Sequence, residues 1–324
     1  MEREDVSMQD IKLTILVPTY NQENYIEECI NSILKQKIDF EFEVLIGEDC
    51  STDNTADILR KLEPELPENF KIYYREKNLG IGAYGNIEDL VLKSHGKYIT
   101  QIEGDDFLTY DLKIQKQIEF LEANPEYVAV AHNCIVVDKW SKSNGEIYVE
   151  CKDEQYTYEH YLNDILPGQT TSTIYLKEYY KYYNEFMDKY KLYDFYPGDR
   201  LRVFLLLSMG KIKCIQEPWS AYRHITTEGS SYSATVPEDE VFKNNQLLFF
   251  KSLKAFAEGE NKRAAIIPAG KLYYMFLFKK CVREHSWGVF MQEILSEKHS
   301  VKYLFYVLRR GFRYLLKKMS SKID

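Results

Sequence analysis

The densest group of acidic side chains follows an apolar run in the segment 99-ITQIEGDDFLTYD-111. Glu103, Asp105 and Asp106 lie within four residues, and like charges so close repel unless a cation binds or the side chains diverge. Carboxylate oxygens at a strand end suit Mg²⁺ or Mn²⁺, which water and substrate phosphates then complete. The same residues also occur in solvated turns, where Asp106 or Asp111 caps the next helix. Both interpretations remain open from the residues alone.

Two further aspartates stand at positions where chemistry is common. Asp49 lies in 47-GEDCSTD-53, where its carboxylate is either a turn residue or an acceptor for a nucleobase imide or a ribose hydroxyl. Asp199 lies in 196-YPGDRLRVFLLLSMGKI-212, between a Pro-Gly turn and an apolar helix. An aspartate there is a helix N-cap or a general base, and one residue can serve as both.

The elements that must position these acids alternate along the first 140 residues. The apolar patterns predict strands at 12–17, 43–46, 71–74, 98–102 and 127–137, and helices at 23–35, 53–62 (capped by Asp53), 85–94 and 111–123. This alternation predicts an α/β fold with a mostly parallel sheet and helices on both faces. Ligands bind at the carboxyl ends of strands in such sheets, and the polar clusters 18–21, 47–53 and 103–106 all fall at those ends.

The second half of the chain has a looser pattern. We expect a polar loop at 138–157, a Thr-rich strand at 170–176, a Tyr-rich helix, a helix at 199–209 and an all-helical region after about 238.

Composition and charge exclude several classes of protein. The 324 residues are 45% hydrophobic, which supports a large core and argues against disorder. The net charge is −8, yet residues 296–324 carry +6, so the remainder carries about −14. An acidic body argues against nucleic acid as a partner.

Cysteine usage and the N-terminus bear on location. Six scattered cysteines without a Cys-x-x-Cys pair are typical of reduced thiols in a cytosolic protein. The start, MEREDVSMQD, is not typical of a signal peptide, and no apolar run approaches the ~20 residues that span a bilayer. We therefore expect a cytoplasmic protein.

Four motifs in register resemble a family 2 glycosyltransferase over residues 11–225. These motifs are Pro18-Thr19-Tyr20-Asn21, Gly47-Glu48-Asp49-Cys50-Ser51-Thr52-Asp53, Asn78-Leu79-Gly80, and Gly96-Lys97-Tyr98-Ile99 leading into Glu103-Gly104-Asp105-Asp106. The resemblance implies a GT-A, Rossmann-like fold that binds a nucleotide sugar. It implies a glycosyltransferase domain at 1–237, with a nucleotide-binding half at about 11–110 and an acceptor half at about 111–237, followed by a helical extension at 238–324.

The resemblance also implies roles for the residues of the nucleotide half. The nucleotide-binding residues would be Pro18, Thr19, Asn21, Asp49, Glu103 and Gly104, with Asp49 on a uracil-type base. Asp105 would be the main metal ligand of the family's Asp-x-Asp motif. Glu103 stands where the first Asp of that motif usually lies, and its partner is ribose, sugar or metal. Asp106 would contact donor or acceptor.

In the acceptor half, the resemblance implies that Asp199 is the general base. The segment 217-EPWSAYRHITTEGSS-231 is similar to the family's segment after the catalytic helix. There His224 or Arg223 would lie over the diphosphate, as a metal ligand or a charge clamp. Trp219 and Tyr222 either stack on a sugar of the acceptor or pack in the core.

The expected function is transfer of a sugar from a nucleotide-diphosphate sugar, UDP-linked, to a hydroxyl of a glycan or lipid-linked acceptor. We expect inversion at the sugar and a divalent cation, Mn²⁺ or Mg²⁺. The rival hypothesis is a non-catalytic GT-A-like scaffold that binds a nucleotide or glycan. A dinucleotide-dependent oxidoreductase needs a Gly-x-Gly-x-x-Gly after the first strand, where Pro18-Thr19-Tyr20-Asn21 stands instead.

The C-terminal segment 299–319 is a predicted amphipathic helix. One arc is apolar, and it consists of Val301, Leu304, Phe305, Leu308, Phe312, Leu315, Leu316 and Met319. Basic side chains occupy the other side. Three interpretations stay open: a helix packed on the domain with a solvated basic face, a helix on the anionic inner surface of the membrane, and a docking site for another protein.

Overall fold

The structure is a computed structural model that describes residues 11–80, 84–148, 151–192, 198–224 and 240–320, with 84 and 312–320 described by their backbone alone. The chain forms two compact units. The first, here called the sheet unit, comprises Met1–Thr157, Ile165–Lys181 and Met209–Thr235. The second, here called the helical unit, comprises Tyr158–Asp164, Tyr182–Ser208 and Val236–Asp324. The predicted domain boundary at 237/238 stays a prediction.

The sheet unit contains most of the predicted strands and helices. Its strands are β1 (Leu13–Thr19), β2 (Phe42–Glu48), β3 (Phe70–Tyr74), β4 (Tyr98–Gln101), β5 (Phe107–Leu108), β6 (Tyr127–Val137), β7 (Ser143–Tyr148), β8 (Gln155–Tyr156), β9 (Ile174–Leu176) and β10 (Lys211–Arg223). Its helices are α1 (Ile26–Leu34), α2 (Thr55–Leu62), α3 (Tyr84–Lys93) and α4 (Lys113–Ala123), with short 3₁₀ turns at Glu63–Glu65 and Thr170–Ser172. Helix α6 (Tyr179–Tyr190) is divided between the two units.

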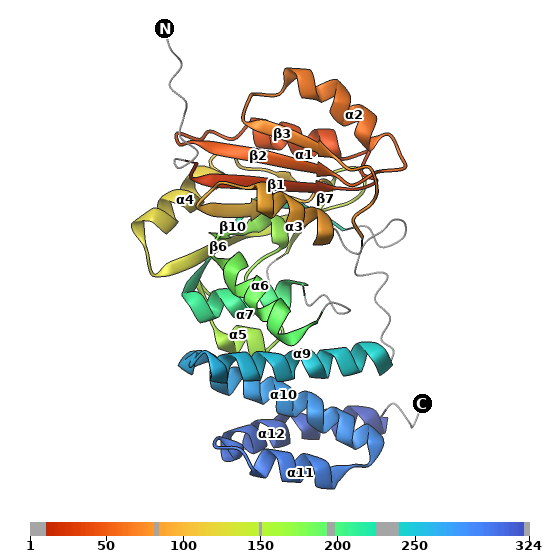
Figure 1. Cartoon of the computed structure of the whole chain (residues 1–324), viewed down its shortest axis with the longest axis vertical. Helices are drawn as coiled ribbons and strands as arrows, with labels where there is room; N and C mark the ends of the chain where they lie inside the picture. The colour runs from red at the N-terminus through yellow and green to blue at the C-terminus, as the bar shows by residue number, and fades with distance from the viewer. Residues whose placement is uncertain (1–10, 81–83, 149–150, 193–197, 225–239, 321–324) are drawn as a thin grey trace. The chain divides into compact units, whose positions relative to one another are not determined.

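The sheet has the strand order β3-β2-β1-β4-β9-β6-β10-β5. The predicted parallel pairing holds over β3-β2-β1-β4, whose neighbouring strands are all parallel. Strands β3, β2 and β1 lie side by side in Figure 1. Beyond β4 the pairing is mixed. Strand β9 is antiparallel to both β4 and β6, whereas β6 and β10 are parallel.

Helices cover both faces of the parallel half, as the alternation predicted. Alternate residues of β1 and β2, such as Ile15, Val17 and Val44, belong to one buried cluster with α1, α2 and α4. Helix α3 packs on β1 and β2 from the other face. The predicted cap Asp53 lies one residue before the N-cap position of α2, which is Asn54; its Oδ1 accepts a hydrogen bond from the backbone N–H of Thr55 at 2.9 Å, in the turn that leads into the helix.

Two segments differ from the prediction. The segment 138–157, predicted to be a loop, contains β7 and β8. Strand β7 is exposed along nearly its whole length, so it lacks the apolar alternation that reveals a half-buried strand. The predicted Thr-rich strand at 170–176 begins as the 3₁₀ turn Thr170–Ser172 and becomes strand β9 only at Ile174.

The helical unit packs α9–α12 around α10, and its described residues from 240 onward are mostly helical, as predicted. Its helices are α5 (Tyr158–Leu162), α7 (Gly198–Met209), α9 (Glu240–Gly259), α10 (Arg263–Glu284), α11 (Trp287–Leu295) and α12 (Ser300–Ser320). Helix α10 packs against α9, α11, α12 and α5 (Figure 1). Among the described residues, no helix is long and apolar enough to cross a membrane.

Helix α12 does not pack through its predicted apolar arc. Its buried residues are Tyr303 and Val307, both fully buried, and Gly311. Three residues of the arc stay exposed: Val301 by 80%, Phe305 by 69% and Leu308 by 61%. The side chains at 312–319 lie outside the described residues. Of the described part of the arc, Val301, Phe305 and Leu308 therefore remain available for a membrane or another partner.

Close approach between α10 and α12 explains this choice of face. The ring of Tyr303 lies against Gly270 of α10 so closely that a Cβ there would be 2.3 Å from the ring carbon Cζ. Gly311 of α12 accepts the ring of Phe278 in the same way. A glycine at each position thus lets an aromatic ring pack against helix backbone.

We predict that Gly270→Ala lowers the free energy of unfolding by about 1–3 kcal/mol, because the new methyl group overpacks the buried Tyr303 ring. Urea denaturation followed by circular dichroism measures this. The matched control is Gly288→Ala in the exposed part of α11, where nothing lies within 4 Å of a new Cβ. That variant should gain about 0.5–1 kcal/mol from helix propensity. Equal effects at the two sites would contradict the packing described.

Candidate functional site

Three polar loops meet at one edge of the sheet. Strand β1 is parallel to both β2 and β4, so the loops that follow these three strands lie together at their carboxyl ends. The backbones are also hydrogen-bonded: Asp49 N donates to Thr19 O at 3.0 Å, and Gly104 N donates to Pro18 O at 3.3 Å. The predicted nucleotide-binding residues are thereby brought together around the end of β1.

The loop after β1 is held by its own side chains. Thr19 Oγ1 donates to Gln22 Oε1 at 2.7 Å. Asn21 has a positive φ of 53°, and its Oδ1 accepts from Thr52 N at 2.8 Å, which ties this loop to the loop after β2. At Gly104, a Cβ would lie 2.3 Å from Gln22 Oε1, so the third loop approaches through a residue without a side chain.

Asp49 lies just inside the protein surface, 2% exposed. Its Oδ1 accepts a hydrogen bond from Leu79 N at 2.8 Å, and its main-chain oxygen accepts one from Asn78 Nδ2 at 3.1 Å. Burial raises the pKa of Asp49, while the Leu79 N–H and the charge of Arg75 act in the opposite direction. The motif Asn78-Leu79-Gly80 therefore orients the Asp49 carboxylate.

Arg75 and Asn86 support this loop and were missed by sequence reasoning. The guanidinium of Arg75 pairs with Asp89 at 2.6 Å and donates to Asn86 Oδ1 at 3.2 Å. Asn86 Nδ2 in turn donates to Gly47 O at 2.7 Å, just before Asp49. The only available signal was an arginine directly after a strand, next to a predicted ligand edge.

In the acidic turn after β4, the crowded carboxylates diverge. Asp106 N donates to Glu103 O at 2.9 Å and closes the turn. The Asp106 side chain points inward and is 2% exposed, whereas Glu103 and Asp105 are half-buried. Burial, followed by the charge of Asp105, raises the pKa of Asp106 to about 7. Diverging side chains therefore relieve part of the expected repulsion.

Both oxygens of Asp106 are occupied by protein donors. Oδ2 accepts from Gln169 Nε2 at 2.7 Å and from Thr171 Oγ1 at 2.8 Å, and Oδ1 accepts from Arg223 N at 3.0 Å. Thr171 Oγ1 also accepts from Glu103 N at 3.3 Å, so one hydroxyl contacts both ends of the turn. The predicted contact of Asp106 with donor or acceptor stays a prediction.

Arg223 holds the same turn from the outer side. Its side chain is fully buried. Nε donates to Asp105 O at 2.9 Å, Nη1 to Asp138 O at 2.8 Å, and Nη2 to Glu28 Oε2 at 2.9 Å. The guanidinium also lies 4.2 Å from the centroid of the Tyr25 ring. These contacts make Arg223 a positioning residue, while its predicted role over the diphosphate stays a prediction.

Asp105 fits the role of a metal ligand. Within the described part of the chain, its carboxylate accepts a hydrogen bond only from its own backbone, and burial raises its pKa despite the charge of Arg223. Mg²⁺ and Mn²⁺ are commonly held by one or two carboxylates, with substrate phosphates and water supplying the rest. The described residues contain no group of three or more His, Cys, Asp or Glu that would hold a metal alone.

A buried polar layer supports the turn from below, and sequence reasoning missed it. Lys113 is fully buried, and its Nζ donates to Thr171 O at 3.2 Å. Burial lowers the pKa of Lys113 to about 7. His132 is also fully buried, and burial together with the charge of Lys113 lowers its pKa well below the ordinary value. These polar residues occur within patterns that otherwise predict a buried helix and a buried strand.

The remaining predicted residues lie on β10 and α7. Trp219 contacts the rings of Tyr110 and His132, at centroid distances of 5.2 and 5.7 Å. His224 is exposed and stacks on Tyr222 at 5.8 Å. Asp199, in the first turn of α7, is half-buried and pairs with Arg202. Asp199 belongs to the helical unit, and its convergence with Asp49 and Asp105 stays a prediction.

We predict that Arg223→Lys lowers the free energy of unfolding by about 2–4 kcal/mol. Lysine keeps the charge but cannot reproduce the buried fork that binds the Asp105 and Asp138 carbonyls and Glu28. Urea denaturation measures the change. Arg60→Lys at an exposed ion pair with Asp57 is the matched control and should change stability by less than about 0.5 kcal/mol. Similar small effects for both variants would mean that the Arg223 contacts contribute little.

A second prediction concerns pH. The folded-state pKa of Lys113 is lowered by burial to about 7, whereas an exposed lysine has a pKa of about 10.4, so between about pH 7 and pH 10 the unfolded chain binds a proton that the folded chain does not. Its contribution to the free energy of unfolding should rise with pH there, by up to about 1.4 kcal/mol per unit. Lys113→Met should lack this rise. Urea denaturation between pH 7 and pH 10 gives the free energy of unfolding of both proteins. If the two plots of this free energy against pH are parallel, Lys113 stays charged in the folded protein.

Comparison with known proteins agrees with this geometry. The model of the protein family described as Glycosyl transferase family 2 matches residues 14–200 of this chain. The putative teichuronic acid biosynthesis glycosyltransferase TuaG of Bacillus subtilis is 34% identical over 109 residues, which cover 34% of this chain and 41% of TuaG. The poly(ribitol-phosphate) beta-N-acetylglucosaminyltransferase TarS of Staphylococcus aureus is 33% identical over 139 residues, 42% of this chain and 22% of TarS. The chain thus matches less than half the length of these relatives.

A solved structure extends the comparison to the fold. S. aureus TarS 1–349 in complex with UDP-GlcNAc superposes with a TM-score of 0.60 at 20% identity, over 91% of this chain and 79% of that one. At this identity the match concerns the fold. Together with the family description, which covers more than half of the sequence, it confirms the predicted fold class. The chain therefore belongs to glycosyl transferase family 2 and has the GT-A fold.

Proposed function

We propose that this chain transfers a sugar from a UDP-linked sugar to a hydroxyl group of a glycan or lipid-linked acceptor, with inversion at the sugar. The observation that carries the proposal is the shared position of Asp49 and Asp105. They follow β2 and β4, the two parallel neighbours of β1, at the edge where such sheets bind ligands. The UDP complex of the TarS structure supports the choice of nucleotide.

In this proposal Asp49 accepts a hydrogen bond from the base, and the loop after β1, with Pro18, Thr19 and Asn21, borders the nucleotide. Asp199 takes the proton from the acceptor hydroxyl. The acceptor oxygen then bonds to C1 of the sugar as the bond from C1 to the diphosphate breaks, and the nucleoside diphosphate leaves on the opposite face.

Asp105 is the residue that would hold a divalent cation, Mn²⁺ or Mg²⁺, with Glu103 and His224 as further candidates. When bound, such a cation supplies Lewis-acid stabilisation of the negative charge on the departing diphosphate. The chain's own contribution is to orient the Asp105 backbone through Arg223, while the Asp105 side chain is half-buried at the ligand edge. This placement is what supports the choice of Asp105 over Asp106.

We also propose that the protein works in the cytoplasm and contacts the inner face of the membrane through 299–319. The exposed Val301, Phe305 and Leu308 support this, because solvated apolar side chains on a basic helix are typical of interfacial helices. A lipid-linked acceptor would be presented at the same surface.

The first functional test separates catalysis from binding. Asp199→Asn should lower kcat by about 10²–10⁴-fold, because an amide cannot accept the acceptor proton, and should leave donor affinity unchanged. Sugar transfer from UDP-GlcNAc with Mn²⁺, using a panel of glycan and lipid-linked acceptors, gives the rates. Glu185→Gln, on the exposed side of α6, is the matched control. Full activity of Asp199→Asn would exclude this base.

The companion variants in the same assay separate the enzyme from a non-catalytic scaffold. Asp49→Ala should weaken UDP binding by about 10- to 100-fold, the loss of one charged hydrogen bond. Asp105→Ala should abolish the effect of Mn²⁺ on thermal stabilisation by UDP. Binding of UDP without transfer or donor hydrolysis by the wild-type protein, under all acceptor conditions, would favour the scaffold.

A further inference from the structure

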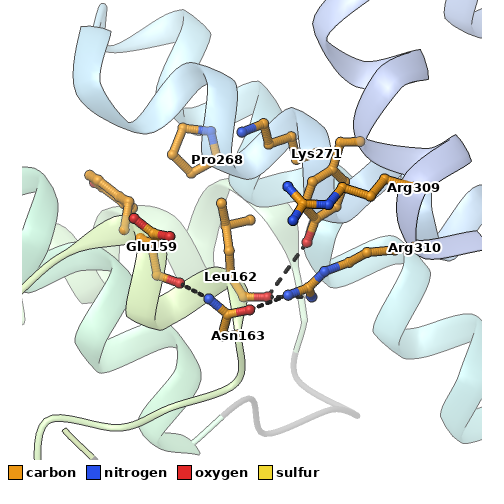
Figure 2. A pocket seen from close by; sticks show the side chains of 9 residues that line it. Glu159, Leu162, Asn163, Pro268, Lys271, Arg309 and Arg310 are labelled. Carbon is orange, nitrogen blue, oxygen red and sulfur yellow. Dashed lines mark hydrogen bonds between the residues drawn. The ribbon is translucent and has the colours of Figure 1, made fainter. Parts of the chain in front are cut away.

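A cavity of about 510 Å³ is lined entirely by residues of the helical unit. It is formed by α5, α10 and α12 (Figure 2). Its lining residues are Tyr158, Glu159, Leu162, Asn163, Pro268, Lys271, Tyr306, Arg309 and Arg310. The lining combines two aliphatic residues and two tyrosines with three cations, so the cavity offers both apolar surface and positive charge to a ligand.

The charges in this cavity do not balance. Lys271, Arg309 and Arg310 face a single carboxylate, that of Glu159. Among the described residues, none of the three cations forms an ion pair within 4.0 Å, although other lysines and arginines of the same unit do, such as Lys254 with Glu297 and Arg283 with Glu240. The cavity therefore has an excess of positive charge, which favours an anionic ligand.

Arg310 is already oriented. Its Nη1 donates to Leu162 O at 2.8 Å, and its Nη2 donates to Asn163 Oδ1, as Figure 2 shows. The guanidinium also lies 5.2 Å from the centroid of the Tyr306 ring. All of these partners are neutral, so they fix the arginine without cancelling its charge. An oriented guanidinium with spare donors is suited to the oxygens of a phosphate.

The exposed apolar stripe of α12 runs beside the cavity. At 100° per residue, Arg309 lies about 40° around the helix from Phe305, about 60° from Tyr306 and about 100° from Arg310. Arg309 thus separates the stripe, defined here as Val301, Phe305 and Leu308, from the cavity-facing residues Tyr306 and Arg310. One helix therefore presents apolar side chains and a cationic cavity next to each other.

We propose that this cavity binds the phosphate of an anionic phospholipid headgroup while the stripe enters the apolar layer of the same membrane. This inference rests on the membrane contact proposed above and deepens it by naming the ligand group and its residues. A phosphate meets the excess charge of Lys271, Arg309 and Arg310, and the attached acyl chains meet Phe305 and Leu308. A flat electrostatic attachment would need the stripe and the basic residues but not a cavity.

The test is co-sedimentation of the full chain with vesicles of equal parts phosphatidylcholine and phosphatidylglycerol. The pocket variant is Lys271→Ala with Arg309→Ala. The matched control is Lys298→Ala with Lys302→Ala, which removes the same charge from exposed residues near and on α12 that do not line the cavity. Each lost charge weakens general attraction by about fivefold in both variants. Vesicle affinity of the pocket variant should fall about tenfold further than that of the charge control, because the hydrogen bonds to the phosphate are also lost.

Further arms identify the source of the phosphate and the role of the stripe. Phe305→Ser with Leu308→Ser should abolish sedimentation and keep thermal stabilisation by inorganic phosphate. Equal losses in the pocket variant and its control would overturn the proposal in favour of surface charge alone. Stabilisation by inorganic phosphate without sedimentation would overturn the lipid as the source. Self-association that the stripe variant removes, again without sedimentation, would assign the surface to a second copy.

Two controls keep the result separate from folding and from the proposed function. Thermal unfolding of the pocket variant should match that of its charge control, since neither pair forms described ion pairs. UDP binding reports on the sheet unit and should be unchanged in all of these variants. Loss of UDP binding through Asp49→Ala, with sedimentation intact, would separate a failure of the donor site from a failure of the lipid site.

Discussion

The candidate site depends on the mutual burial of Asp106 and Arg223. The Asp106 carboxylate accepts a hydrogen bond from the backbone of Arg223, and the Arg223 guanidinium donates to the backbone of Asp105. Neither side chain is stable at such depth without partners, because an unpaired buried charge costs several kcal/mol. The arrangement fixes the turn and leaves the Asp105 carboxylate half-exposed. Asp105, the candidate metal ligand, is thus positioned by Asp106 and Arg223, which need not contact the ligand themselves.

This arrangement links the site to the completion of the sheet. Arg223 is the last residue of β10, which pairs with β5 and β6 and lies more than a hundred residues after the acidic turn. The turn therefore acquires its final geometry only when β10 has joined the sheet. Thr171 and Gln169 add a second long-range constraint from the segment before β9. Local propensity shapes the loop, whereas distant strands decide where its carboxylates point.

Strands and helices with a regular apolar pattern were predicted from the sequence. Elements and residues that interrupt such a pattern were not. Apolar runs ending in polar clusters located the strands of the β3-β2-β1-β4 half and the acids at their ends. Strand β10 was not predicted, since Gln216 and Glu217 are exposed and its register shifts around Pro218. Lys113 and His132 were not identified because nothing local distinguishes a buried polar residue from an exposed one. On α12 the sequence pattern was interpreted from the large apolar side chains. The packing face is set instead by Gly270 and Gly311, which let aromatic rings pack against helix backbone.

The proposed function assigns the donor and the acceptor to different parts of this chain. The loops around β1 are cross-linked by backbone and side-chain hydrogen bonds, among them those of Asn21, Asp49 and Gly104, so their shape is set before any ligand binds. Such preorganisation favours one nucleotide, because little conformational entropy remains to be lost on binding. Asp199 and the cationic cavity belong instead to the helical unit, outside this cross-linked group of loops. If Asp199 acts as the proposed base, changes in acceptor should therefore arise by substitution in the helical unit, with the loops around β1 left as they are.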